Sequence, residues 1–127
     1  MATKREFRLK RVYAPPEAGD GARILVDRLW PRGISKDKGK IDLWLKDIAP
    51  SDELRRRFHA RPEKWPEFCA AYAIELKGAA PQAAVKELAD RRRKGPVTLL
   101  YAARDEAHNN AVALQAWLAR HGKGPAS

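Results

Sequence analysis

The sequence has very little cysteine and no long hydrophobic run. Cys69 is the single cysteine among 127 residues, which excludes an internal disulfide framework and a cysteine-rich zinc site and fits a reducing compartment. No apolar run approaches the roughly 18 residues that a membrane span needs. The N-terminus also lacks the hydrophobic stretch of a signal peptide. We therefore expect a cytoplasmic protein.

Common signatures of cofactor, nucleophile and metal sites are absent as well. Gly19-Asp20-Gly21 is a lone G-x-G that precedes a predicted strand, whereas dinucleotide loops follow a strand and open a helix. Ser51 lacks the flanking glycines of a nucleophile elbow. Asp27, Asp105 and His108 would form a carboxylate and imidazole metal site only if the fold brought them together, and no spacing motif supports this. We expect neither a cofactor nor a metal.

Positive charge is what the chain has in excess. With 26 Lys and Arg against 16 Asp and Glu the formal net charge is +10, while 44% of residues are hydrophobic, enough for the core of one domain over 1–127. The densest basic runs, 55–57 and 91–94, fall in predicted helices, and the cations of 91–94 complement the dipole at the end of their helix. Such runs of charge usually form a solvated face. They contain none of the aromatic residues that a nucleic-acid groove interleaves with its cations. The excess charge still raises the expectation of an anionic partner.

Hydrophobic patterning predicts strands that alternate with helices. Strands are expected at 9–13 and at 97–101. A third strand is expected to begin at Ile24, with a helix over 22–30 as the alternative. A fourth is expected at 41–45, with a short helix as the alternative. Helices are expected from a Ser51 cap to about 59, from 62 to 78, from 81 to 94, and from an Asp105 cap to 122, with 122–127 as a frayed tail. This alternation predicts a single α/β domain with a mostly parallel central sheet of about four strands and helices on both faces.

Ligands of open parallel sheets bind beyond the carboxyl ends of the strands. The segments to inspect are Tyr13 with its proline loop, 27–33, 47–51 and 101–109. In the second of these, Asp27, Arg28, Trp30 and Arg32 place one carboxylate, one indole and two guanidinium groups close together, and arginine matches phosphate or carboxylate in a bidentate fork. The structural alternative is an ion pair of Asp27 with an arginine and a core position for Trp30.

The clearest strand leads into a second polar group, formed by Tyr101, Arg104, Asp105, His108 and Asn109. Free backbone N–H groups at the start of the following helix attract anions, and histidine titrates near neutrality. The alternative is local capping by Asp105 with local hydrogen bonds of the residues after it. Our candidates for proton transfer are Asp27, Asp105 and His108. Our candidates for ligand contacts are Arg28, Trp30, Arg32, Tyr101, Arg104 and Asn109.

Taken together, the motifs match a known family. The pattern from Arg23 to Gly33, the Trp44-Leu45-Lys46 segment leading to Ser51, and the stretch from Leu99 through Asp105 to His108-Asn109 resemble the YeaO-like branch of the domain of unknown function 488 family over nearly the whole chain. The resemblance implies a small bacterial intracellular α/β protein with a strand over 24–30, and it carries no established activity. A sister branch has a Cys-His-Arg triplet where this chain has Ala107-His108-Asn109, so thiol chemistry does not carry over.

Two functions remain open from the sequence, and so does whether the chain is an enzyme. The first is a domain that binds an anionic small molecule at the carboxyl edge of the sheet and could act on it. This hypothesis predicts that the candidate residues converge in one pocket. The second is a non-catalytic module that binds nucleic acid or an acidic protein through its basic surface, which predicts a continuous positive face.

Overall fold

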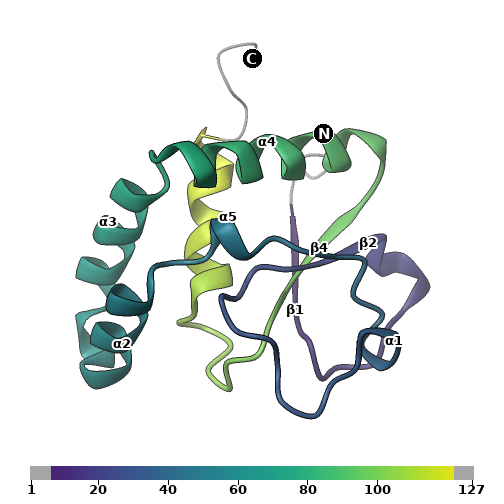
Figure 1. The fold of residues 1–127 in the computed structure, drawn as a ribbon, viewed down its shortest axis with the longest axis horizontal. Helices are drawn as coiled ribbons and strands as arrows, with labels where there is room; N and C mark the ends of the chain where they lie inside the picture. The colour runs from purple at the N-terminus through teal and green to yellow at the C-terminus, as the bar shows by residue number, and fades with distance from the viewer. Residues whose placement is uncertain (1–6, 122–127) are drawn as a thin grey trace.

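The computed structural model describes residues 7–121, and the frayed tail predicted at 122–127 lies outside the described residues. The strands are β1 (Arg8–Arg11), β2 (Ala22–Leu25), β3 (Leu43–Trp44) and β4 (Val97–Tyr101). The helices are α1 (Lys36–Gly39), α2 (Asp52–Ala60), α3 (Trp65–Glu75), α4 (Ala79–Lys94) and α5 (Asn110–His121) (Figure 1). Short 3-10 turns are η2 (Ala18–Asp20), η3 (Lys46–Ile48) and η4 (Pro62–Lys64). Over residues 7–121, no helix is long and apolar enough to cross a membrane.

The four strands form one parallel sheet in the order β1-β4-β2-β3, which confirms the predicted α/β fold. All five residues of β4 are buried, as expected for a central strand that is covered on both faces. Leu99 of β4 pairs with Leu9 on one side and Ile24 on the other. Of the two alternatives for 41–45, the structure has the strand, because Leu43 pairs with Ile24.

The second strand ends earlier than the strand over 24–30 that the resemblance implied. The last ladder bond beyond β2 runs from the Val26 amide to the Leu100 carbonyl (3.1 Å). At Asp27 the side chain rather than the backbone bonds the neighbouring strand, and Pro31 has no N–H to donate to a ladder. Residues after Val26 therefore leave the sheet and form a loop across its carboxyl edge.

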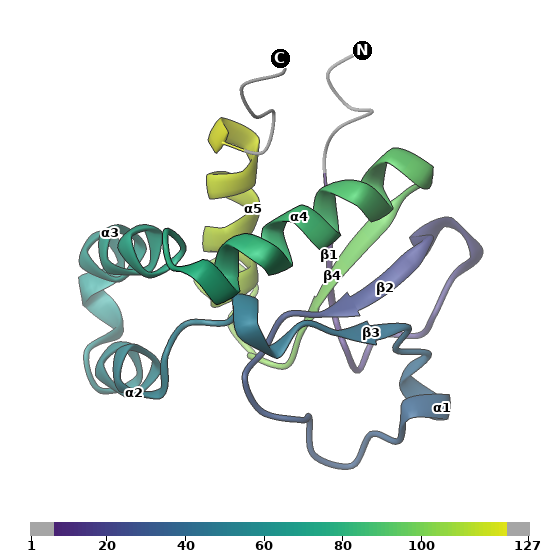
Figure 2. The ribbon, with the colours of Figure 1, turned by 45° about the horizontal axis from the view of Figure 1, so that its top comes forward.

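The two faces of the sheet have different covers. Alternate strand residues such as Ile24, Leu99 and Tyr101 pack against α3, α4 and α5 in the main core. Leu25 and Leu100 point the other way, into a small second cluster beneath the loop that holds the one-turn helix α1. Figure 2 shows α1 and the long helix α4 on opposite sides of the strands. Helices thus lie on both faces, but most of the core lies on one.

A buried ion cluster lies on the second face, and nothing in the sequence patterns indicated it. Arg23 and Asp20 are only 3% and 5% exposed, and Arg23 Nη1 lies 2.6 Å from Asp20 Oδ2. Lys10 Nζ donates to Asp20 Oδ1 (2.8 Å), and Arg23 Nη2 donates to the Gly39 carbonyl (2.8 Å). The cluster connects the turn η2 and the end of α1 to strands β1 and β2.

Helix starts follow local capping only in part. Ser51 caps α2 as predicted, since its Oγ accepts a hydrogen bond from the Leu54 amide (3.1 Å). The helix expected from Pro62 begins with the turn η4 and becomes α-helical at Trp65. The last helix begins at Asn110 rather than after an Asp105 cap, because the Asn109 side chain caps it.

Candidate functional site

Asp27 joins three elements at the carboxyl edge of the sheet. Its Oδ2 accepts a hydrogen bond from the Ala102 amide after β4 (2.9 Å), and its Oδ1 accepts one from Asn110 Nδ2 at the start of α5 (3.1 Å). Burial raises the pKa of the Asp27 carboxyl, and these two hydrogen bonds and the charge of Arg55 offset only part of that rise. Asp27 therefore holds β2, β4 and α5 in register, and Asn110, which the sequence analysis did not select, is its partner.

Two arginines lie beside this junction, and neither forms the ion pair with Asp27 that was the structural alternative. Arg28 donates from Nε to the Pro50 carbonyl (2.9 Å) and from Nη2 to the Ala49 carbonyl (3.1 Å), so it holds the segment that precedes α2. Arg55, from the basic run of α2, has an Nη2 atom 3.3 Å from Asp52 Oδ1, while its Nε atom is buried without a partner. In the sequence, Arg55 is only one cation of the basic run 55–57 in a predicted helix.

The loop after β2 presents aromatic rings at the same edge. Trp30 is 37% exposed and Tyr13, from the end of β1, is 42% exposed. Trp30 packs edge-on against Trp44 with ring centroids 5.3 Å apart, and its Nε1 donates to the Ile34 carbonyl (2.6 Å). Tyr13 Oη donates to the Arg32 carbonyl (3.0 Å). These bonds fix both rings on one loop and leave a large part of each ring in solvent, so Trp30 is not a core residue.

Cations accompany these rings. The Arg11 guanidinium lies over the Tyr13 ring at 5.1 Å, and the Lys46 ammonium lies over the Trp44 ring at 5.4 Å. The Arg32 side chain is exposed and has no partner within residues 7–121. We call this surface the aromatic edge; it consists of Tyr13, Leu29, Trp30 and Trp44 with Arg11, Arg32 and Lys46.

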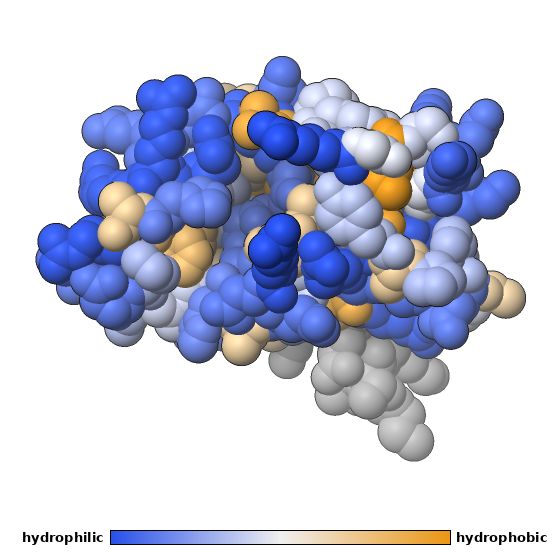
Figure 3. Space-filling model, turned by 90° about the horizontal axis from the view of Figure 1, so that it is seen from below, coloured by the Kyte–Doolittle hydropathy of each residue, from blue (hydrophilic) through white to orange (hydrophobic). Residues whose placement is uncertain are grey.

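Three strand ends contribute to the aromatic edge. Its members follow β1, β2 and β3, and the loop after β2 bridges them because it carries both the indole and the carbonyl that Tyr13 binds. Figure 3 views the molecule from the side toward which β1 and β4 run, and the surface there is mostly hydrophilic with separate hydrophobic spots. The strand-end rule pointed to Tyr13 by position, but only the fold shows that it meets the loop of Trp30.

The residues after β4 form a capped turn in front of α5. Asp105 Oδ1 accepts hydrogen bonds from the amides of Ala107 (2.8 Å) and His108 (3.0 Å), which lower the pKa of the Asp105 carboxyl. Asn109 caps the helix, since its Oδ1 accepts from the Val112 amide (2.9 Å) and its Nδ2 donates to the Asp105 carbonyl (2.9 Å). The helix begins after Asn109 because Asn109, not Asp105, meets its free amides. The chain thus satisfies amides that a bound anion would otherwise meet.

The other residues of this group point in different directions. His108 is half-exposed, with its Nδ1 3.5 Å from Asp105 Oδ2 and its ring edge-on to Trp65 at 5.0 Å. Tyr101 is buried, and burial raises the pKa of its hydroxyl. Arg104 is exposed and has no partner among the described residues. Asp105, His108 and Asn109 lie together and the Tyr101 hydroxyl bonds Asn109, whereas the exposed Arg104 side chain makes no described contact with them.

The predicted residues therefore separate into three groups. Asp27 and Arg28 hold elements together, Trp30 and Arg32 belong to the aromatic edge, and the turn before α5 is bonded within itself. Between residues 7 and 121 no group of three or more His, Cys, Asp or Glu side chains is arranged to hold a metal ion.

Comparisons with known proteins agree on one family. A family model described as the inactive DUF488-N3 subclade matches residues 6–124. The uncharacterized protein YeaO of Escherichia coli K12 is 49% identical over 109 residues, which cover 86% of this chain and 93% of that protein. The uncharacterized protein Rv3073c of Mycobacterium tuberculosis H37Rv is 41% identical over 114 residues, which cover 90% and 94%. No solved structure gives a significant match.

Proposed function

The chain belongs to the DUF488 family, in the subclade described as inactive, and from this premise we propose that it is a non-catalytic binding domain. Its ligand combines a phosphate group with a nucleobase and binds at the aromatic edge. This chemistry occurs in free nucleotides and in single-stranded nucleic acid. The proposal keeps the anionic ligand at the carboxyl edge that the sequence indicated and adds a planar ring to it.

The observation that carries the proposal is the exposure of two fixed aromatic rings among cations. Stacking of a base on an aromatic side chain contributes roughly 1–3 kcal/mol. Trp30 and Tyr13 already have their polar atoms bonded to backbone carbonyls, so little side-chain freedom is lost when a base stacks on them. Arg32 is free to meet a phosphate in a charge-assisted pair. Surface rings held in this way support recognition of a base.

Binding without catalysis is favoured by the bonds of the residues predicted to transfer protons. Both carboxylate oxygens of Asp27 accept hydrogen bonds from the fold, and Asp105 Oδ1 accepts two from its own turn. The hydrogen bonds of these two carboxylates therefore stabilise the fold. His108 is left as an exposed imidazole, packed on Trp65, without an arranged nucleophile beside it. The description of the subclade as inactive points the same way.

The residues predicted to contact a ligand have different roles in this proposal. Trp30 and Arg32 contact the ligand, together with Tyr13 and Lys46, which the sequence analysis did not commit to. Arg28, Tyr101 and Asn109 receive no ligand contact, because Arg28 binds the Ala49 and Pro50 carbonyls, Tyr101 is buried and Asn109 caps α5. Arg104 adds positive charge at the same edge. The cytoplasmic location expected from the sequence stays a prediction.

Fluorescence anisotropy and calorimetry at low salt test this function with three probes: a labelled oligothymidylate, a mononucleotide, and inorganic polyphosphate as the ligand without bases. We expect Trp30→Ala to weaken oligonucleotide binding by about fivefold or more, the lower end of one stacking contact. Trp30→Phe should restore much of it. Arg32→Glu should also weaken oligonucleotide binding, because Arg32 is the proposed phosphate contact. Lys86→Glu on α4 is the matched control, since Lys86 is an exposed cation far from the edge in sequence.

The probes separate the two sources of the ligand. Binding of the mononucleotide with the same sensitivity to Trp30→Ala indicates a free nucleotide, and binding of the oligonucleotide alone indicates a single strand. If polyphosphate binds as tightly as the oligonucleotide and Trp30→Ala changes neither, then only charge is recognised and the proposal is wrong. Absence of binding to all three probes also overturns it.

A further inference from the structure

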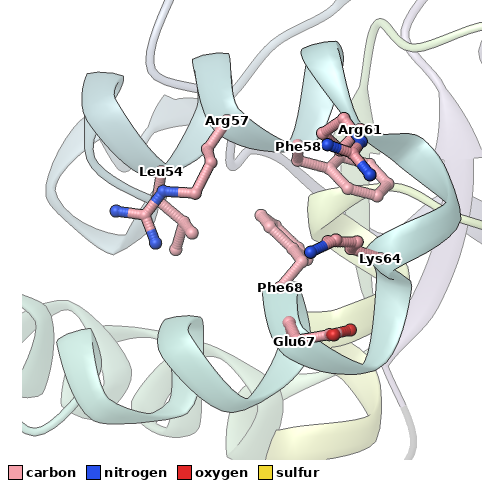
Figure 4. A pocket seen from close by; sticks show the side chains of 7 residues that line it. All are labelled: Leu54, Arg57, Phe58, Arg61, Lys64, Glu67 and Phe68. Carbon is pink, nitrogen blue, oxygen red and sulfur yellow. The ribbon is translucent and has the colours of Figure 1, made fainter.

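A second surface feature lies away from the aromatic edge, between α2 and α3. A cavity of about 250 Å³ opens there, lined by Leu54, Arg57, Phe58, Arg61, Lys64, Glu67 and Phe68 (Figure 4). We call it the α2–α3 groove. Figures 1 and 2 place α2 and α3 at the opposite end of the molecule from α1. The groove therefore does not share residues with the proposed nucleotide site.

The floor of the groove is apolar and already formed. Leu54 and Phe68 are each 4% exposed, and the rings of Phe58 and Phe68 have centroids 4.6 Å apart. Trp65 stacks on Phe68 with ring centroids 5.6 Å apart. The cavity is smaller than the roughly 300–1,000 Å³ of pockets that enclose small-molecule ligands. Its size fits one large apolar side chain better than a metabolite.

The rim of the groove carries three cations and one carboxylate. Figure 4 shows Arg57 extending along one side, and the charged ends of Arg61 and Lys64 near each other at the other end. Arg61 is bonded to Glu63 (2.7 Å) and Arg57 Nη2 lies 3.5 Å from Glu53 Oε2; the side chains of both pairs are exposed, and such exposed pairs are weak. The Lys64 ammonium forms no hydrogen bond or ion pair within residues 7–121, although its charge helps to lower the pKa of the neighbouring Glu63. Carboxylates from a partner can therefore replace the present contacts at little cost.

An acidic protein segment matches this combination better than nucleic acid does. The groove leaves only a small part of its rings open, because Phe68 is buried and Phe58 is half-buried and packed against it, so it can take one side chain but has no platform for successive bases. A buried apolar pocket surrounded by charged residues is the usual arrangement around an anchor side chain in protein interfaces. Complementary charge on the partner then sets orientation and association rate.

We propose that the α2–α3 groove docks an acidic peptide segment, which inserts one large apolar side chain over Phe58 and Phe68 and places carboxylates against Arg57, Arg61 and Lys64. The inference is independent of nucleotide binding, since the two surfaces have no residue in common. One molecule can hold both partners. The carboxylate of Glu67 on the same rim opposes this partner, and its removal is a specific test.

Binding of short labelled peptides to the full chain tests the proposal. One peptide is rich in glutamate with a single central Phe, and its match has Ala in place of the Phe. We expect the Ala peptide to bind at least about tenfold more weakly, as for a buried anchor residue. Lys64→Glu should weaken binding of the Phe peptide by about fivefold, and Glu67→Lys should strengthen it by a similar factor. Both changes are in the range of one exposed charge contact. Trp30→Ala and Lys86→Glu should change neither.

The gain expected from Glu67→Lys cannot come from misfolding, so the test does not depend on a loss alone. If both peptides bind equally, the groove recognises charge and has no anchor, which overturns the inference while leaving the nucleotide proposal intact. If an oligonucleotide competes with the Phe peptide and responds to Lys64→Glu, then the groove belongs to nucleic acid. If neither peptide binds at low salt, the docking proposal is wrong.

Discussion

Replacing Asp20 by alanine would break the buried ion cluster on the second face of the sheet. The carboxylate accepts from Arg23 Nη1 at 2.6 Å and from Lys10 Nζ at 2.8 Å, and without it the Arg23 charge stays buried and unpaired. Removal of one partner of a buried ion pair costs about 3–5 kcal/mol. We expect the lower end, about 3 kcal/mol, because the carbonyls of Gly39 and Lys40 continue to bind the guanidinium.

That loss is a large share of the stability of a small domain, which is about 5–15 kcal/mol. For a chain of this length it corresponds to a fall in melting temperature of about 10 °C. Urea unfolding near neutral pH, followed by circular dichroism, measures the loss of unfolding free energy. Glu63→Ala is the matched control, since Glu63 accepts from Arg61 at 2.7 Å with both side chains exposed, and it should leave the unfolding midpoint unchanged. Equal midpoints for the two variants would refute the reasoning.

The same cluster has a defined dependence on pH. Burial alone would raise the pKa of the Asp20 carboxyl, but hydrogen bonds from Lys10, the Glu17 amide and Arg23 outweigh it and lower the pKa below its ordinary value of 3.8. Asp20 therefore stabilises the fold above the unfolded pKa, and this contribution is lost as pH falls through the folded pKa. The difference in stability between the natural chain and Asp20→Ala should shrink on acidification below about 3.8 and persist above it.

Two further predictions concern the carboxyl edge and a turn. The pKa of Asp27 is raised by burial, so its charged form opposes folding, and stability present below the ordinary value of 3.8 is lost as pH rises through the folded pKa. Asp27→Asn should remove this decline from the pH profile of the unfolding free energy; an unchanged slope would contradict the assignment. Gly21 has φ +66°, and a Cβ there would lie 2.2 Å from the Pro96 carbonyl oxygen. Gly21→Ala should therefore destabilise by more than about 2 kcal/mol. Gly33→Ala, with φ +73° but open space, should cost only about 1 kcal/mol, and urea unfolding of both variants measures the difference.

Much of the fold follows from local patterns in the sequence. The continuous apolar run at 97–101 predicts a central parallel strand because such a strand must be apolar on both faces, and it is β4. The Ser51 cap predicts the start of α2 because a cap depends on residues within one turn. The end of β2 was misplaced because it is decided by a partner distant in the chain, and the start of α5 was misplaced because two side chains four residues apart could each cap that helix. Asp27 bonds Ala102 across the sheet, and Asn109 competes with Asp105 for the helix amides.

The sequence predicted where the candidate site lies better than it predicted which residues form it. The rule that ligands bind beyond strand ends led to Trp30 and Arg32 and pointed to Tyr13. It could not show that Tyr13 bonds the Arg32 carbonyl or that Trp44 supports the Trp30 ring, because those contacts depend on how the loop crosses the edge. Arg28 was grouped with Arg32 by sequence, yet it binds backbone carbonyls and points into the fold.

The sequence by itself determined the fold class, the family and the edge of the sheet where polar residues gather, since these depend on hydrophobic period and on short motifs. Only the tertiary structure decided which charges are buried, which rings stay exposed and where a cavity opens. Lys10, Asp20 and Arg23 look like ordinary surface charges in the chain, and the fold makes two of them core residues. The α2–α3 groove likewise needs the packing of two helices that no single segment specifies. Whether a charged side chain is buried depends on residues distant in the sequence, so the presence of a charge in the chain does not predict its burial.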